Sequence, residues 1–264
     1  MELFAFDVDG TLVSGDRPLT PLDISEMNYH LSRGDAICIA SGRPVSGGLK
    51  YLNLLTDSPF RYVVGSNGSV VKDIKGETIY RKGLTYSDFL RIYKYFASPE
   101  RSIYCYIEDD IGYFDYTFVV DEEYRWNQMR NKIDFNSSPL PLDDYITKIV
   151  VCSKPEDSSE LEKNLDKYDL AGMRTVRSSP VFLEFVNPTA DKAEGVAALA
   201  EKLNIEENSI HTFGDAMNDY LMVKRFDGTA MGNAVPEVKA VAKRVTKTVD
   251  EDGVGYALKA WFHK

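Results

Sequence analysis

The stretch LFAFDVDGT at residues 3–11 indicates the fold of this chain. Its first part, Leu3 to Phe6, is apolar and typical of a buried strand, and it runs directly into two carboxylates, Asp7 and Asp9. Such a pair either begins a hairpin turn, because Asp-Gly after an apolar run is a common turn signal, or surrounds a cation that relieves the repulsion between like charges. The rest of the sequence decides between these two interpretations.

The composition describes an ordinary globular protein. The chain has 264 residues, of which 44% are hydrophobic and 27% charged, so it is long enough for one large domain or two smaller ones. Its formal net charge is -10, which argues against a general nucleic-acid binder, because phosphate backbones attract an excess of Lys and Arg. An anionic substrate would therefore need a local positive charge, and a metal ion could supply it.

The cysteines and the apolar runs indicate in which cellular compartment the protein is expected. Cys38, Cys105 and Cys152 are an odd number without CxxC spacing, which favours reduced core cysteines. The start of the chain has no basic segment followed by an apolar run, and no run approaches the length of about 18 apolar residues needed to span a membrane. We therefore expect a cytoplasmic protein without a signal peptide and without a membrane partner.

Strands and helices alternate at both ends of the chain. Short apolar runs at 36–40 and 210–213 resemble strands that are covered on both faces. Helical periodicity covers 20–34 and 190–205. This alternation predicts an α/β fold, a doubly wound parallel sheet of the Rossmann-like kind with helices on both faces.

The middle of the chain has a different pattern. Residues 83–185 are rich in Tyr and Phe and contain hairpin-like pairs at 102–120 and 173–186, alternating with helical segments. We expect an inserted α+β domain over 83–185. The outer core is then discontinuous and consists of 1–82 and 186–264.

Polar residues follow the strands of the predicted core. Asp7 and Asp9 end the first strand, Ser41 and Asp215 follow two later strands, and Lys192 begins a helix. Taken singly, these residues have ordinary explanations as a turn, a loop, the acid at the start of a helix and a surface lysine. Together they are expected to meet in one crevice, because ligands of doubly wound sheets bind outside the carboxyl ends of the strands.

The chemistry of this set favours phosphoryl transfer. Asp7, Asp9 and Asp215 form an oxygen-rich group that suits Mg²⁺. A carboxylate that attacks a phosphate dianion meets a repulsion of about 4 kcal/mol per charge pair at 4 Å and an effective dielectric near 20. Mg²⁺ and Lys192 would offset this repulsion, and Ser41 with nearby backbone N–H groups would hold the phosphoryl oxygens. One carboxylate can then attack to give an aspartyl-phosphate, and a second can transfer protons.

These residues resemble the motifs of a known family. DVDGT at 7–11, Ser41, Lys192 and GDAMND at 214–219 are similar to motifs one to four of the haloacid dehalogenase (HAD) superfamily of phosphohydrolases. The long insertion and the segments SGRP, SNGS, AMGNA and DEDGV resemble the Cof-type sugar-phosphate phosphatases with a type-two cap. The cap is matched only in length and in its α+β pattern. One departure is Ala193, where many relatives have Gly.

The resemblance implies a role for each matching residue. Asp7 is the nucleophile and Asp9 the general acid and base, while Lys192 neutralises the phosphoryl group. Mg²⁺ is held by Asp7, Asp215 and the backbone carbonyl of Asp9.

The resemblance also implies a set of substrate-binding residues. Ser41 binds the phosphoryl group, and the whole set comprises Ser41, Gly42, Arg43, Asn67 and Asn218. Asn218 also supports the metal site, together with Asp219.

The expected function is therefore Mg²⁺-dependent hydrolysis of a small phosphorylated metabolite, most readily a sugar phosphate. A phosphomutase or phosphotransferase that uses the same aspartyl-phosphate is the alternative, since the acceptor is a sugar hydroxyl in place of water. A receiver-type signalling domain shares the acids and the Lys, but it is about half this length and lacks a second Asp two residues after the first. The oligomeric state stays open, and a monomer is compatible with the sequence.

Overall fold

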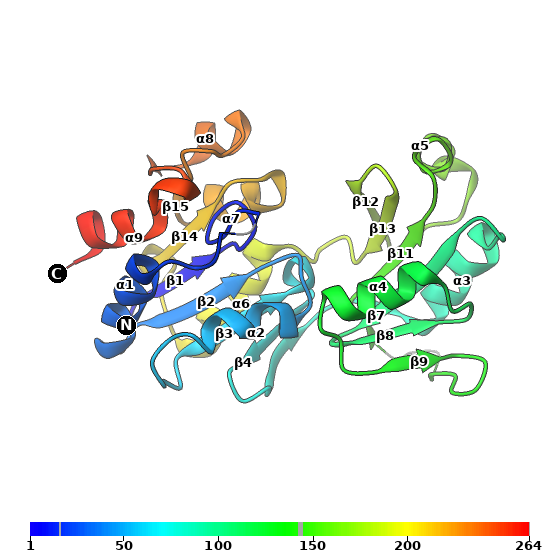
Figure 1. Ribbon diagram of the computed structural model, residues 1–264, viewed down its shortest axis with the longest axis horizontal. Coiled ribbons are helices and arrows are strands. Elements are labelled where there is room, and N and C mark those ends of the chain that lie inside the picture. Colours follow the sequence, from blue (N-terminus) through cyan, green and yellow to red (C-terminus); the bar gives the residue numbers. More distant parts are fainter. Residues whose placement is uncertain (16, 142–144, 264) are drawn as a thin grey trace. The chain divides into compact units, whose positions relative to one another are not determined.

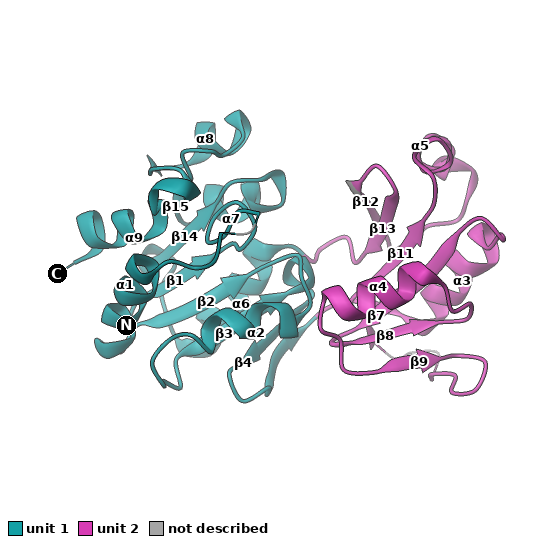
Figure 2. Cartoon of the chain, viewed as in Figure 1, with its two compact units in different colours: residues 1–81, 191–264 teal, residues 82–190 magenta. Residues whose placement is uncertain are grey.

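A computed structural model describes residues 1–15, 17–141 and 145–263. The chain divides into two compact units, which Figure 2 shows in two colours: unit 1 is Met1–Arg81 with Asp191–Lys264, and unit 2 is Lys82–Ala190. The units divide one residue before the expected start at 83 and five residues after the expected end at 185. Near both ends of unit 2, the Asn187 side chain donates to the carbonyl of Gly83 at 2.9 Å.

Unit 1 is built on one eight-stranded sheet with the order β16-β15-β14-β1-β2-β3-β4-β5. Neighbouring strands from β16 to β3 are parallel, and the β4–β5 hairpin adds an antiparallel edge. The strands are β1 (Leu3–Phe6), β2 (Ala36–Ala40), β3 (Arg61–Gly65), β4 (Val70–Asp73), β5 (Thr78–Arg81), β14 (Ile210–Gly214), β15 (Asp227–Ala230) and β16 (Arg244–Val245). The predicted doubly wound sheet is confirmed, and the antiparallel edge is an addition to it.

Helices cover both faces of this sheet, as Figure 1 shows. They are α1 (Pro21–Ser32), α2 (Val45–Leu52), α6 (Lys192–Leu203), α7 (Tyr220–Arg225), α8 (Pro236–Val241) and α9 (Gly253–Ala257). Right-handed crossovers place α1 and α2 on one face and α7 on the other. In agreement with this, α1 packs against α9, whereas α7 packs against α6 and α8. The central strands β1, β2, β3, β14 and β15 are therefore buried along their whole length, whereas the edge strands β5 and β16 are partly exposed.

Sequence signals at the helix start explain where α1 begins. The Thr20 side chain accepts from the N–H of Asp23 at 3.2 Å, and the Asp23 carboxylate accepts from the Thr20 hydroxyl at 2.9 Å. Pro21 occupies the first helical position, where its missing N–H costs nothing.

Unit 2 contains a six-stranded sheet with the order β12-β13-β11-β7-β8-β9 and a two-stranded β10–β6 sheet. Its strands are β6 (Leu84–Thr85), β7 (Ser102–Ile107), β8 (Asp110–Tyr113), β9 (Lys132–Asp134), β10 (Tyr145–Ile146), β11 (Lys148–Cys152), β12 (Arg174–Ser179) and β13 (Phe182–Val186). Its helices are α3 (Tyr86–Phe96), α4 (Phe118–Trp126) and α5 (Pro155–Lys163). All pairings in the larger sheet are antiparallel except β8 with β9.

The hairpin expected within 102–120 is confirmed by the antiparallel pairing of β7 with β8, but it is shorter than the aromatic run. Its second strand stops at Tyr113, and a helix begins at Phe118. Thr117 causes the change, because its side chain caps the helix by accepting from the N–H of Val120 at 3.3 Å.

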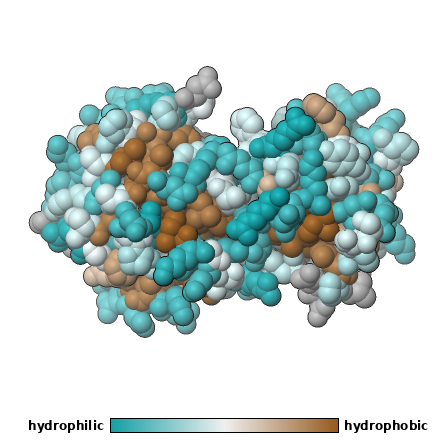
Figure 3. Space-filling view, turned by 60° about the horizontal axis from the view of Figure 1, so that its bottom comes forward, coloured by the Kyte–Doolittle hydropathy of each residue, from teal (hydrophilic) through white to brown (hydrophobic). Residues whose placement is uncertain are grey.

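Hydrophobic side chains on the surface do not by themselves mark a functional site. On the face seen in Figure 3, hydrophobic residues (brown) form patches between hydrophilic ones (teal). Apolar atoms contribute more than half of the accessible surface of a typical folded protein, so apolar areas of this kind are expected on it. Among the described residues, no helix combines the length and the apolar character needed to cross a membrane.

Candidate active site

The loop after β1 starts the site. The N–H of Asp7 donates to the carbonyl of Phe213 on β14 at 3.0 Å, so Asp7 continues the strand and its side chain is buried. Gly10 has φ +93°, and a Cβ there would lie 2.3 Å from a carboxylate oxygen of Asp215. Only glycine therefore lets this loop pass so close to the end of β14.

Three carboxylates meet at the carboxyl ends of β1 and β14. Asp7, Asp215 and Asp219 each present an oxygen within 4.8 Å of the other two, and we call them the acid cluster. The buried ammonium of Lys192, the first residue of α6, donates to Asp7 Oδ1 and Asp219 Oδ1 at 2.6 Å each. The Thr11 hydroxyl donates to Asp215 Oδ1 at 3.1 Å. Segments far apart in the sequence thus supply one charged centre.

The surroundings of Asp7 and Asp215 oppose the ionisation of these two side chains. Burial, followed by the charge of Asp219, raises the pKa of Asp7 to about 8 although Lys192 acts in the opposite direction. Burial and Asp219 also raise the pKa of Asp215 to about 6. Burial alone would lower the pKa of Lys192, but the charges of Asp219 and Asp7 outweigh it and raise that pKa. One ammonium carries too little positive charge to balance three carboxylates, of which Asp7 and Asp219 are buried and Asp215 is half-buried.

The donor set fits a hard divalent cation. When all three carboxylates are ionised, they and the ammonium together carry a charge of about -2, and oxygen ligands are those that Mg²⁺ prefers. Asp219 already accepts from Lys192 with one oxygen and from the N–H groups of Asp215 and Ala216 with the other, at 3.0 Å each. Asp7 and Asp215 are therefore the better direct ligands, and Asp219 holds the lysine and the loop in place.

The predicted residues after β2 lie on a tightly held loop. The N–H of Ser41 donates to the carbonyl of Val64 at 2.9 Å, and the Ser41 hydroxyl accepts from the N–H of Arg43 at 3.1 Å. The Arg43 guanidinium donates to both oxygens of Asp9, at 2.8 and 2.6 Å. The Asp9 side chain is 57% exposed and its carboxylate is not part of the acid cluster.

The turn after β3 connects three parts of the site. Ser66 and Asn67 both have left-handed backbone, at φ 49° and 54°. The Asn67 amide oxygen accepts from Asn218 at 3.1 Å, and its N–H donates to the carbonyl of Ser41 at 3.0 Å. A Cβ at Gly42 would lie 3.2 Å from the same amide oxygen. The structure therefore brings Gly42, Asn67 and Asn218 together.

Gly68 in the same turn supports the start of α6. It has φ +94°, and a Cβ there would lie 1.8 Å from the carbonyl oxygen of Asp191. Asp191 is the N-cap of α6 and accepts from the N–H of Glu194 at 3.0 Å. The position of Lys192 thus depends on a glycine in a loop more than a hundred residues earlier in the chain.

Sequence reasoning missed two supporting contacts. Asn233 donates to the carbonyl of Gly10 at 2.8 Å and accepts from the N–H of Val249 at 2.9 Å, which ties the loop after β15 to the loop after β1. The second missed contact is the hydrogen bond that the Thr11 hydroxyl donates to Asp215. Both residues lie in motifs that the sequence singles out, but only the folded loops show which atoms they bind.

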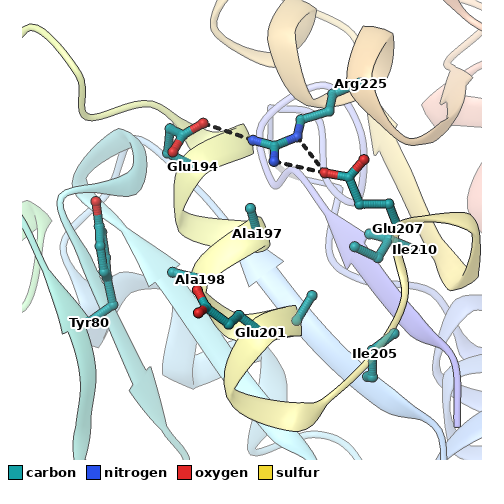
Figure 4. Close-up of a pocket in the computed structure, with 10 residues that line it drawn as sticks. Tyr80, Glu194, Ala197, Ala198, Glu201, Ile205, Glu207, Ile210 and Arg225 are labelled. Atoms are coloured by element: carbon teal, nitrogen blue, oxygen red, sulfur yellow. Dashed lines mark hydrogen bonds and ion pairs between the residues drawn. The ribbon is translucent and has the colours of Figure 1, made fainter.

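A separate hollow on unit 1 contains none of the predicted site residues. It measures about 400 Å³, and Figure 4 shows Tyr80 on one side of α6 and Arg225 on the other. Arg225 donates to Glu207 at 3.0 and 2.7 Å and to Glu194 at 2.7 Å. Arg225 of α7 is thus paired with Glu194 of α6 and with Glu207, and these contacts connect the two helices at the rim of the hollow.

Comparison with known proteins gives consistent matches over nearly the whole chain. The model of the haloacid dehalogenase-like hydrolase family matches residues 4–258. HMP-PP phosphatase of Escherichia fergusonii is 29% identical over 244 residues, covering 90% of this chain and 86% of that protein. 5-Amino-6-(5-phospho-D-ribitylamino)uracil phosphatase of Bacillus subtilis is 23% identical over 275 residues, covering 98% and 97%.

A solved structure agrees with the fold as well. A haloacid dehalogenase-like hydrolase of Bacteroides thetaiotaomicron superposes with a TM-score of 0.83 at 28% identity, covering 98% of both chains. The family match covers most of both halves of unit 1 and the whole of unit 2. The chain belongs to the haloacid dehalogenase-like hydrolases.

Proposed function

We propose that this enzyme is a Mg²⁺-dependent phosphatase that hydrolyses small phosphate monoesters through a phosphorylated Asp7. The observation that carries the proposal is the buried ammonium of Lys192 at 2.6 Å from both Asp7 and Asp219, beside a third carboxylate. A positive charge held against a buried carboxylate at a strand end suits an attack on an anionic phosphoryl group. The phosphatase names of two relatives support the same reaction.

The two acids of the loop after β1, Asp7 and Asp9, have different roles in the proposed reaction. The reaction starts with Asp7 ionised and Asp9 protonated. In the first step an oxygen of Asp7 forms a bond to phosphorus while the bond from phosphorus to the leaving oxygen breaks, and Asp9 gives its proton to that oxygen and becomes a carboxylate. In the second step Asp9 takes a proton from water, the water oxygen bonds to phosphorus, and the bond from Asp7 to phosphorus breaks. Inorganic phosphate leaves and both acids return to their starting forms.

The remaining groups bind and orient the phosphoryl group. Lys192 neutralises charge next to Asp7, and Ser41 with Gly42 offers donors from the loop after β2. Asn67 and Asn218, which bind each other at 3.1 Å, line the approach to this loop. Asp7, Asp215 and the Asp9 carbonyl would hold Mg²⁺, whose positive charge would offset the repulsion between nucleophile and phosphate.

The proposed substrate is a small phosphorylated metabolite, most readily a sugar phosphate. Two relatives are named for small phosphorylated molecules, and the net charge of -10 disfavours polyanionic nucleic acid. We assign the choice among substrates to the inserted domain, unit 2, because the groups proposed to act on phosphorus all belong to unit 1. Buried free cysteines at 38, 105 and 152 support the expectation of a reducing, cytoplasmic compartment.

A phosphomutase or phosphotransferase remains the second candidate, since it would share the phosphorylated Asp7. The acceptor separates the two functions. Release of inorganic phosphate in step with alcohol supports hydrolysis, whereas transfer to an added sugar supports the alternative.

The proposal is tested by metal removal together with a single substitution. EDTA should abolish hydrolysis of 4-nitrophenyl phosphate, and added Mg²⁺ should restore it. Asp7→Asn should abolish turnover without unfolding the protein, whereas the exposed control Asp169→Asn should keep the activity. Activity that survives in EDTA would exclude the metal, and a phosphoryl group trapped by acid quench on a residue other than Asp7 would exclude the proposed nucleophile.

A further inference from the structure

Arg43 makes a contact that the proposed reaction does not use. Its guanidinium donates from Nε to Asp9 Oδ2 at 2.8 Å and from Nη2 to Asp9 Oδ1 at 2.6 Å. A paired contact of this kind fixes the orientation of a carboxylate as well as its position. Among the described residues, the carboxylate of Asp9 has no other hydrogen-bond partner.

Arg43 is itself well fixed. Its N–H donates to the Ser41 hydroxyl at 3.1 Å, and its carbonyl accepts from the N–H of Ser66 at 2.7 Å. Its stem packs on Gly47 in α2, where an added Cβ would lie 2.9 Å from the Cβ of Arg43. The Arg43 side chain is only 19% exposed, whereas that of Asp9 is 57% exposed. The arginine is therefore the anchored partner and Asp9 the partner that needs holding.

The acid cluster makes this restraint useful. Asp9 follows Asp7 by two residues, yet its carboxylate stays outside the cluster of Asp7, Asp215 and Asp219. A free carboxylate so close to a cation site could turn toward the cation and become a further ligand. Its oxygens would then be lost for proton transfer.

We propose that Arg43 is a positioning residue that holds the carboxylate of Asp9 apart from the acid cluster and oriented for proton transfer. This assignment rests on the proposed function and differs from the sequence-based expectation, in which Arg43 contacts the substrate. The difference is testable, because a residue that acts through Asp9 affects only the steps in which Asp9 moves a proton.

The test compares leaving groups. In kcat/KM, which reports the steps through the breaking of the substrate's phosphorus–oxygen bond, a poor leaving group depends on the proton from Asp9 and a good one does not. Arg43→Met should therefore lower kcat/KM for an alkyl phosphate by about tenfold or more and leave that for 4-nitrophenyl phosphate within about twofold. Inhibition by inorganic phosphate should not change.

Two controls sharpen the comparison. Arg101 makes the same paired contact with Asp157 in unit 2, at 2.7 and 2.6 Å, so Arg101→Met removes an equivalent ion pair remote in sequence from Asp9 and should show no dependence on the leaving group. In an Asp9→Asn background, Arg43→Met should add no further loss. If Arg43→Met folds poorly by circular dichroism, Arg43→Gln serves in its place, since Gln keeps one donor but cannot form the pair.

The outcomes separate the inference from the proposed function. Equal losses for both substrates, or weaker inhibition by phosphate, would show that Arg43 contacts the substrate and would overturn the inference. Unchanged kcat/KM for both substrates would overturn it as well. A wild-type protein without phosphatase activity would instead overturn the proposed function.

Discussion

Lys192 is the residue on which the charge balance of the site depends. It is 1% exposed and lies between two carboxylates, each at 2.6 Å. Removing one partner of a buried ion pair is strongly destabilising, because the remaining charge has neither water nor a counter-ion. The lysine therefore contributes both to the fold and to the proposed reaction.

We expect Lys192→Met to lower the free energy of unfolding by about 3 kcal/mol in EDTA and to abolish phosphatase activity. The matched control is Lys202→Met, at an exposed position in the last turn of the same helix. It should change the free energy of unfolding and the phosphatase activity only slightly. Urea denaturation and turnover of 4-nitrophenyl phosphate measure the two effects. Equal stability of both variants would contradict the role given to the buried ammonium.

At the residue scale the sequence identifies the charged members of the site but not their partners. Asp7, Lys192 and Asp215 follow strands or begin a helix, so topology alone brings them to one edge of the sheet. The contact of Arg43 with Asp9 depends on side-chain rotamers and on the shape of a loop, which no spacing encodes. The central place of Asp219, which binds Lys192 and two backbone N–H groups, is hidden for the same reason.

Among the elements, the turn at Ser66–Gly68 stands out because it determines where α6 begins. Its glycine touches the carbonyl of Asp191, so a side chain there would push the helix start and Lys192 away from the acid cluster. Gly68→Ala should destabilise the protein by about 2 kcal/mol and reduce kcat/KM strongly.

Gly76, at φ +88° in the next turn, provides the control for this element. An added Cβ there meets no atom within 4 Å, so Gly76→Ala carries only the backbone strain, about 1 kcal/mol, and should keep the activity. Thermal unfolding and kinetics of both variants separate the strain from the contact. Similar effects of the two substitutions would show that the contact with Asp191 is unimportant.

Strands that are buried on both faces can be predicted from the sequence, whereas helix α4 cannot. β1 at Leu3–Phe6 and β2 at Ala36–Ala40 lie where the apolar runs predict, because a strand buried on both faces has no polar positions. α4 was not predicted, since aromatic and β-branched residues such as Phe118 and Val119 favour strands. The cap at Thr117 decided for a helix, and a single capping residue is a weak signal in a sequence.

For the whole molecule, the two units have separate cores. Among the described residues, the buried core of unit 1 consists of side chains up to Val71 and from Ala193 onward, whereas the cores of unit 2 lie between Leu84 and Phe185. We propose that the inserted domain is an independent folding unit. The expected domain boundaries at residues 83 and 185 stay predictions.

A fragment of residues 82–190 should therefore unfold cooperatively on its own, with a melting temperature that Mg²⁺ does not change. The full chain should gain stability from Mg²⁺, because an ion that binds only the folded acid cluster raises the free energy of unfolding of unit 1. Differential scanning calorimetry of both proteins with and without Mg²⁺ measures this. A fragment without a cooperative transition would show that unit 2 needs unit 1 in order to fold.

The position of β1 in the middle of the sheet has a consequence for biosynthesis. Its neighbour β14 begins at Ile210, so the ribosome must add about 200 further residues after β1, including all of unit 2, before this pairing can form. At about 5–20 residues per second, one edge of β1 waits roughly 10–40 s without its partner. During this interval the nascent chain exposes an apolar strand edge of the kind that promotes aggregation. A ribosome-bound chaperone that covers the first residues of the chain should therefore increase the yield of folded enzyme.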